Sequence, residues 1–240
     1  MRTAHPDAFL RNRMLLGHTA ADRLAASHVA VLGLGGVGGY AAEALARAGV
    51  GALTLVDHDT VGATNLNRQM CALHSTLGSR KVDVAADRLA DINPALRLHP
   101  LFLRYETRTR EDFFAIPCDY IIDAIDIVTC KLDLIEQAMG RGLPIVSALG
   151  VGNKLDPSQL RITDISKTQT CPLARVMRRE LRCRNIRHHT VLWSPEPPLP
   201  PDPLEPPPEG RRSVPASVPW VPACAGFMLA GHVARQLMEM

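Results

Sequence analysis

A glycine-rich segment, Gly33-Leu34-Gly35-Gly36-Val37-Gly38, has the spacing Gly-x-Gly-x-x-Gly. Glycines at this spacing let the backbone approach phosphate groups and direct the first N–H groups of a following helix toward them. Asp57 follows this segment by nineteen residues, where a carboxylate at the end of the next strand accepts hydrogen bonds from ribose hydroxyls. An NAD-dependent oxidoreductase satisfies these features as well as an ATP-dependent enzyme does. The expected backbone ligands of the nucleotide are Gly33, Gly35, Gly36 and Gly38.

Three further features favour ATP. The run Asn65-Leu66-Asn67-Arg68-Gln69 offers amides and a guanidinium, which suit a polyphosphate. Lys81 follows Arg68 by thirteen residues and brings a second cation. Asp126 is expected to end another strand of the same sheet, where its carboxylate would hold a hydrated Mg²⁺. The expected nucleotide ligands here are Asn65, Asn67, Arg68 and Lys81, and the expected catalytic residues are Arg68, Lys81 and Asp126.

These residues need a scaffold that brings distant parts of the chain to one edge. The apolar runs predict helices over 7–27, 40–48, 81–92, 109–115 and 129–141, and strands over 29–32, 53–56, 96–103, 120–126 and 144–147. Such alternation is typical of an α/β protein of the Rossmann-like, doubly wound kind, with a mostly parallel sheet and helices on both faces.

The chain changes character beyond residue 150. Residues 171–189 are rich in arginine, and residues 195–222 hold twelve of the nineteen prolines. We expect an arginine-rich helix, then an extended crossing, then a short helix over 225–238. Spacings of three and four place four arginines along one face of the first helix, as a phosphate-binding surface for an RNA. These candidates are Arg175, Arg178, Arg179 and Arg182.

Composition limits the remaining possibilities. The net charge of +3 is too small to indicate nucleic-acid binding by itself. Neither a spanning apolar run nor a signal-peptide pattern is present, which favours the cytoplasm and no membrane partner. The six cysteines contain no Cys-x-x-Cys pair, so we expect neither zinc nor a disulfide framework. Cys171 stands apart, because Thr170 as N-cap and Pro172 at the first helical position would place its thiol at a helix N-terminus.

The order and spacing of several motifs resemble the adenylating domain of the ubiquitin-activating-enzyme superfamily. The motifs are Gly33–Gly38, Asp57-x-Asp59, Thr64-Asn65-x-Asn67-Arg68-Gln69, Lys81, Ile92-Asn93-Pro94 and Asp123-Ala124-Ile125-Asp126. The resemblance implies one adenylating domain over residues 1–240. Its nucleotide-binding core would span 7–150, and the extension 151–240 would serve the substrate and the dimer. It also implies that the glycine loop contacts the phosphates, Asp57 the ribose and Asp126 the Mg²⁺.

Within the superfamily, the chain is most similar to the dehydratase family that acts on threonylcarbamoyladenosine in tRNA. Asn153-Lys154-Leu155-Asp156-Pro157 and Lys167-Thr168-x-x-Cys171-Pro172-Leu173-Ala174 carry this likeness past residue 170. The resemblance implies that the threonyl carboxylate is adenylated by ATP and the side chain then closes to a ring. It further implies a homodimer in which Arg11 or Arg13 reaches the partner's ATP, and it leaves room for a sulfur-relay partner protein.

Other functions remain open at this stage. An adenylyltransferase for a small ubiquitin-like sulfur-carrier protein would share every ATP residue, but it often carries a zinc site. An NAD-dependent oxidoreductase would leave Arg68, Lys81 and Asp126 without a role. A non-catalytic nucleotide-binding scaffold would bind ATP without turnover. Cys171 is a candidate nucleophile in the carrier reaction, whereas intramolecular ring closure requires no thioester.

Overall fold

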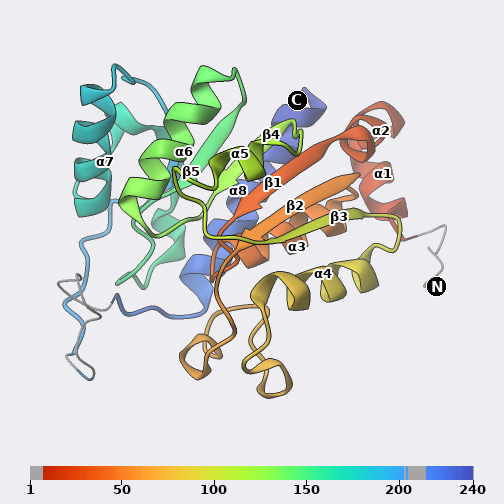
Figure 1. The fold of residues 1–240 in the computed structure, drawn as a ribbon, viewed down its shortest axis with the longest axis horizontal. Helices are drawn as coiled ribbons and strands as arrows, with labels where there is room; N and C mark the ends of the chain where they lie inside the picture. The colour runs from red at the N-terminus through yellow and green to blue at the C-terminus, as the bar shows by residue number, and fades with distance from the viewer. Residues whose placement is uncertain (1–7, 203, 205–214, 240) are drawn as a thin grey trace.

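A computed structural model describes residues 8–202, 204 and 215–239, and its centre is one seven-stranded sheet (Figure 1). The strand order is β3-β2-β1-β4-β5-β7-β6, and all neighbours are parallel except β6 and β7. The strands are β1 (His28–Leu32), β2 (Ala52–Asp57), β3 (Arg97–Phe102), β4 (Tyr120–Asp123), β5 (Ile145–Ala148), β6 (Arg161–Asp164) and β7 (Thr190–Trp193). The predicted doubly wound, mostly parallel sheet is confirmed.

Helices cover both faces of the sheet. The α-helices are α1 (Leu10–Leu16), α2 (His18–Ala26), α3 (Gly38–Ala48), α4 (Lys81–Ile92), α5 (Arg110–Phe114), α6 (Val128–Gly140), α7 (Pro172–Cys183) and α8 (Trp220–Met238). Short 3-10 turns are η1 (Ala63–Asn65), η2 (His74–Thr76), η3 (Pro157–Gln159) and η4 (Ile165–Lys167). One apolar cluster joins α2, α3, α4 and α8 to the sheet, and a second joins α5, α6 and α7 to its other face.

The sequence of β1 shows why two cores form. Val29 and Val31 enter the first cluster, and Ala30 and Leu32 enter the second. Successive side chains of a strand point to opposite faces, so a strand covered on both sides must be apolar throughout. That requirement explains the continuous apolar runs from which the strands were predicted.

The predicted boundaries are wrong at several points. The lead-in helix over 7–27 is two helices, because Gly17 at φ +79° ends α1 and precedes α2. The strand predicted over 120–126 ends at Asp123. It pairs with β1, whose last paired residue, Leu32, is followed by the turn at Gly33. The short strands β6 and β7 were not predicted.

The C-terminal third also differs from expectation. The last helix begins at Trp220, so the end of the proline-rich stretch 195–222 forms the first turn of α8. Pro222 is tolerated there, because the first N–H groups of a helix have no acceptor within it. Residues 195–202 and 215–219 have no helix or strand, while 203 and 205–214 lie outside the described residues. Within the described part, no helix is both long and apolar enough to cross a membrane.

Candidate active site

A cavity of about 790 Å³ opens at the carboxyl ends of the central strands. It lies where β1 separates β2 from β4, the point at which the strand order reverses and at which doubly wound sheets bind their ligands. Its volume falls within the range of roughly 300–1,000 Å³ that is usual for small-molecule sites. The walls come from the glycine loop, from 57–59 after β2, from 124–127 after β4 and from 150–154 after β5.

The glycine loop is a tight turn between β1 and α3. Gly33 has φ +87° and donates its N–H to Val56 O over 2.8 Å. A Cβ on Gly38 would lie 1.8 Å from Gly33 O, so the turn closes only without a side chain there. Gly33, Gly35 and Gly36 line the cavity, whereas Gly38 serves the close packing behind it. The loop and Val37, the N-cap of α3, therefore form the cavity wall, so an anion in the cavity would lie at the N-terminus of this helix.

Asp57 connects the end of β2 to this loop. Its two carboxylate oxygens accept hydrogen bonds from Leu34 N at 2.6 Å and Asp59 N at 2.8 Å. The side chain is buried and still lines the cavity. The carboxylate thus holds the glycine loop in place while the same side chain forms part of the cavity wall.

The two predicted cations lie in the same cavity. Lys81 is buried and its ammonium pairs with Asp59 at 2.9 Å. Arg68 is half-buried, donates to Thr64 O and to Asn67 Oδ1, each at 2.9 Å, and burial lowers its pKa. Arg68 reaches the cavity from the turn after η1, and Lys81 reaches it from the first residue of α4. Two cations in one cavity suit a polyphosphate chain.

The two predicted asparagine ligands stand outside the cavity wall. Asn65 Oδ1 accepts from Gly62 N at 3.1 Å within η1, and Asn67 donates to Ser217 O at 3.0 Å. Asn67 thereby joins its loop to the segment that leads into α8. Gln69 lines the cavity instead, and its buried Oε1 has no hydrogen-bond donor among the described residues. In this structure Gln69, rather than either asparagine, presents a side-chain amide to the site.

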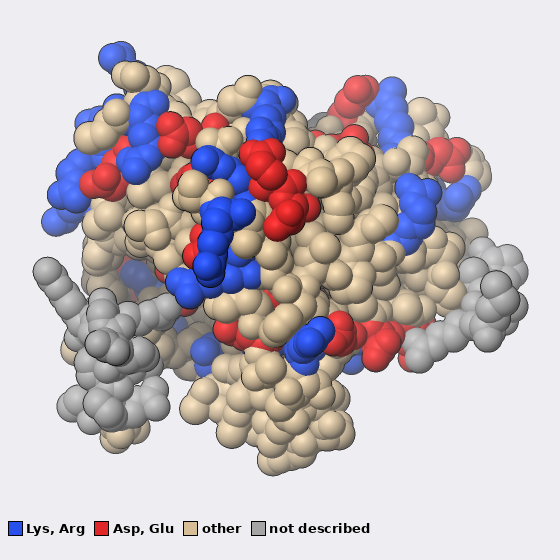
Figure 2. Space-filling model, viewed as in Figure 1, with Lys and Arg blue, Asp and Glu red and all other residues tan. Residues whose placement is uncertain are grey.

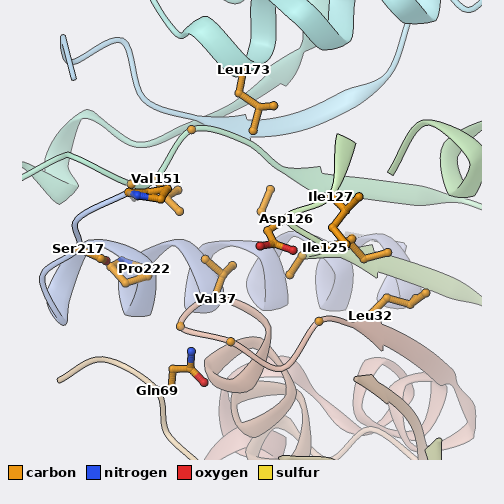
Figure 3. Close-up of a pocket in the computed structure, with 18 of the residues that line it drawn as sticks. Leu32, Val37, Gln69, Ile125, Asp126, Ile127, Val151, Leu173, Ser217 and Pro222 are labelled. Carbon is orange, nitrogen blue, oxygen red and sulfur yellow. The ribbon is translucent and has the colours of Figure 1, made fainter. Parts of the chain in front are cut away.

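Asp126 lies three residues beyond the end of β4 and lines the cavity. Figure 3 shows it between Val37 of the glycine loop and Leu173 on the opposite side. Its exposed carboxylate has the hard oxygen donors that Mg²⁺ prefers. Asp57, His58 and Asp59 form a second group of possible metal ligands, because one side-chain ligand atom from each lies within 4.8 Å of the others.

A buried polar cluster beneath Asp126 was not predicted. Asp123 at the end of β4 is fully buried, accepts from Lys131 Nζ at 2.7 Å and from Ser147 Oγ at 2.6 Å, and also holds Ile125 N. Ser147 Oγ in turn contacts His189 Nε2 at 2.8 Å. Because the single hydroxyl proton goes to Asp123, the ring nitrogen donates to Ser147. Burial, followed by the charge of Lys131, lowers the pKa of His189 to about 4.

The two N-terminal arginines are far from this cavity in their own chain. α1 and α2 precede β1 at the amino ends of the strands, opposite the edge that carries the site (Figure 1). Arg11 is exposed, and Arg13 forms an ion pair with Asp22 at 3.5 Å. Neither side chain lines the cavity.

The four arginines of α7 divide into two kinds. Arg175, Arg179 and Arg182 are exposed, whereas Arg178 is half-buried and donates to Thr168 O at 2.8 Å. Arg179 also pairs with Glu180 at 2.8 Å. In Figure 2, acidic side chains lie among the basic ones at the upper left, where Figure 1 places α7. The face available to a phosphate is therefore narrower than the sequence predicted.

The prediction of Thr170 as N-cap is wrong: Cys171 is itself the N-cap of α7, and Thr170 precedes it with φ +61°. Its Sγ accepts from Ala174 N at 3.4 Å, and Pro172 occupies the first helical position as predicted. The thiol is buried at the cavity wall directly against Gly150, where a Cβ would lie 2.2 Å from it.

The sequence profile of the ThiF family matches residues 9–238, and the chain belongs to this family. It is 42% identical over 245 residues to the tRNA threonylcarbamoyladenosine dehydratase of Bacillus subtilis, covering 96% of this chain and 94% of that protein. The crystal structure of the corresponding Escherichia coli enzyme in complex with ATP superposes with a TM-score of 0.87 at 32% identity, covering 97% and 94% of the two chains. The E. coli molybdopterin-synthase adenylyltransferase is 35% identical over 54% of this chain and 52% of its own length.

Proposed function

We propose that this protein is an ATP-dependent tRNA threonylcarbamoyladenosine dehydratase, which closes the threonylcarbamoyl side chain to its cyclic form. The observation that carries the proposal is the single cavity in which the glycine loop, Arg68, Lys81 and Asp126 meet. The high identity to the Bacillus subtilis dehydratase over nearly the whole chain supports tRNA as the substrate. ATP and tRNA as substrates also favour the cytoplasm.

The reaction uses ATP to convert a poor electrophile into a good one. A carboxylate oxygen of the threonyl group attacks the α-phosphorus, and the bond from phosphorus to the pyrophosphate oxygen breaks. A nucleophile within the same side chain then attacks the acyl carbon and loses its proton, and AMP leaves with the former carboxylate oxygen. The products are the cyclic nucleoside, AMP and pyrophosphate, so the tRNA loses the elements of one water.

The side chains of the cavity divide this work. N–H groups of the glycine loop hold phosphate oxygens, while Arg68 and Lys81 stabilise the charge that develops during transfer. Asp57 orients the loop and accepts from the ribose. Asp126 would hold Mg²⁺, which neutralises phosphate charge when bound.

A second copy of the chain completes the site in this proposal. Three large apolar side chains of α1 are exposed beside Arg11, namely Leu10 at 50%, Met14 at 69% and Leu15 at 85%. Apolar exposure of this kind is typical of a surface that another chain covers. Arg11, with Arg13 as the alternative, would reach the partner's ATP from that surface. One adenylating domain, 1–240, would then combine the core 7–150 with the substrate and dimer extension 151–240.

The alternative function, adenylation of a sulfur-carrier protein, is favoured by the likeness to molybdopterin-synthase adenylyltransferase. It would make Cys171 the nucleophile that takes over the acyl group, with a sulfur-relay protein as partner. Replacing Cys171 with Ser distinguishes the two functions. Full activity is expected for the dehydratase, because ring closure is intramolecular, whereas a carrier reaction that passes through the thioester would stop.

The direct test uses ATP, Mg²⁺ and tRNA that carries threonylcarbamoyladenosine. Mass spectrometry of the digested tRNA should show the loss of one water, accompanied by AMP release. Asp126→Ala should abolish AMP release with the fold retained, while Asp112→Ala, an exposed aspartate of α5, should act like the wild type. Wild-type turnover by Asp126→Ala would remove Asp126 from the mechanism, and an unchanged tRNA mass would reject the dehydratase.

A further inference from the structure

Lys154 has an unusual environment for a lysine. The residue is only 3% exposed, its Nζ is buried, and that nitrogen has no hydrogen-bond acceptor among the described residues. Burial lowers its pKa, against the opposing influence of Cys171 and Glu196. A buried ammonium without a partner costs several kcal/mol, so such a group is rarely kept for stability alone.

The neighbouring polar groups are committed elsewhere. The two carboxylate oxygens of Glu196 accept from Leu155 N at 3.0 Å and from Asp156 N at 3.1 Å. Cys171 Sγ accepts from Ala174 N at the start of α7. The contacts among the described residues thus leave the three N–H donors of Lys154 for something that enters the cavity.

The backbone just before Lys154 is held firmly. Asn153 adopts φ +58°, and its Oδ1 accepts from Ala216 N at 2.7 Å. Its own N–H donates to Ala216 O at 2.8 Å, and its carbonyl accepts from Leu199 N at 3.0 Å. These contacts join 150–154 to two points within the proline-rich stretch, Leu199 and Ala216. The side chain of Lys154 therefore extends from a backbone that hydrogen bonds hold in place.

Lys154 also lies in a different part of the cavity from the phosphate ligands. It belongs to the 150–154 wall, which Cys171 and Leu173 extend. In Figure 3, Val151 and Leu173 stand across the cavity from Val37 and Gln69. Since Arg68 and Lys81 supply the cations on the glycine-loop side, a cation on this side serves a second anion.

We infer that Lys154 binds the free carboxylate of the substrate and holds it for adenylation. The inference rests on the proposed function, in which the carboxylate belongs to the threonyl group on tRNA. An ammonium fits this ligand, because charge-assisted hydrogen bonds to a carboxylate are short and strong. Once the carboxylate has become an acyl adenylate its negative charge is gone, so the contact weakens and the acyl group is free to close the ring.

The test compares two probes: tRNA bearing threonylcarbamoyladenosine, and the same tRNA with the carboxylate converted to its methyl ester. The wild type should bind the free acid about 10- to 100-fold more tightly, as expected for a hydrogen bond between two charged groups. Lys154→Met should lose this preference and raise KM for the acid by a similar factor. Lys154→Arg should keep part of it. ATP affinity should stay unchanged in both variants.

The pH dependence of substrate binding distinguishes the effect of the charge of Lys154 from the effect of its shape. Burial lowers the pKa of Lys154 in the free protein, and a bound carboxylate would raise it again. Affinity for the acid should therefore fall as pH rises through that pKa, and Lys154→Met should lack this dependence. Lys167→Met, at an exposed lysine outside the cavity, is the matched control and should behave like the wild type.

The outcomes distinguish a failure of the inference about Lys154 from a failure of the proposed dehydratase function. If the wild type turns over the tRNA and Lys154→Met still prefers the acid, the inference is wrong and the dehydratase stands. If Cys171→Ser reproduces the loss of activity in Lys154→Met while the acid preference survives in both, Lys154 acts on the thiol and the inference is again wrong. If the wild type neither turns over the tRNA nor distinguishes acid from ester, both claims fail.

Discussion

Lys131→Met tests whether the buried cluster beneath Asp126 holds the site together. Lys131 is 1% exposed, Asp123 is fully buried, and their charged atoms lie 2.7 Å apart. Removing one partner of such a pair leaves an uncompensated charge in the interior, which costs about 3–5 kcal/mol. For a domain of this size that corresponds to a fall in Tm of about 6–20 °C. Asp123 also accepts from Ile125 N. Without the ammonium this carboxylate should shift, so the loop that carries Asp126 should loosen and ATP affinity should fall.

The assay is denaturant unfolding followed by ATP binding, with Lys167→Met as the control for loss of an exposed lysine. The control should lie within about 0.5 kcal/mol of the wild type. The double variant Asp123→Asn, Lys131→Met should be more stable than Lys131→Met alone, because it no longer contains an unpaired carboxylate. If Lys131→Met unfolds within about 1 kcal/mol of the wild type, or if the double variant loses the sum of both single effects, the pair does not work as described.

Three other sets of substitutions test individual contacts of the structure. Burial lowers the pKa of His189 to about 4, so the free energy of unfolding should decrease by about 3 kcal/mol as pH falls from 6.5 to 4. His189→Asn should lack this pH-dependent loss of stability, and an equal dependence of stability on pH in both proteins would contradict the prediction. Gly38→Ala should destabilise the fold by more than about 4 kcal/mol, because the new Cβ meets Gly33 O. In Gly35→Ala the nearest neighbour of the new Cβ is Gln69 Nε2 at 3.8 Å, so this variant should fold normally and bind ATP weakly. If the loop were not tight, calorimetry would show the reverse order of stability for the two variants. Arg182→Ala should weaken tRNA binding and reduce the slope of log affinity against log salt concentration by roughly one. Arg178→Ala should chiefly lower Tm, because Arg178 donates to Thr168 O. An affinity for tRNA that does not depend on salt would exclude a phosphate contact.

The sheet and the nucleotide side of the site were predictable because their signals are local. Gly33–Gly38 and Asp57 stand in one strand–loop–helix–strand unit, and Arg68 and Lys81 follow within the next connection. The strand end after β4 was not predictable, since the apolar run continues to Asp126. Only the pairing of Asp123 with Leu32, the last paired residue of β1, shows where the strand stops.

The rest of the site depends on contacts between distant parts of the chain. Lys131, Ser147 and His189 belong to no sequence motif. Ser147 and His189 come close to Asp123 because β4, β5 and β7 are neighbours, and Lys131 reaches it from α6. Lys154 was visible as part of a motif, but its lack of a partner is a property of the folded state. The sequence likewise could not show that Arg178 differs from the other three arginines of α7, because the difference depends on the position of Thr168.

The contact between Gly36 and Pro222 has a consequence for how the protein is made. A Cβ on Gly36 would lie 3.2 Å from Pro222 at the start of α8, so the wall of the nucleotide loop comes from a helix that is translated after every strand of the sheet. Loops that close over so much chain form late, because their closing entropy precedes any compensating contact. A nascent chain therefore exposes its glycine loop on the ribosome long before the wall arrives. ATP binding should appear only when α8 has left the exit tunnel and packed against the glycine loop.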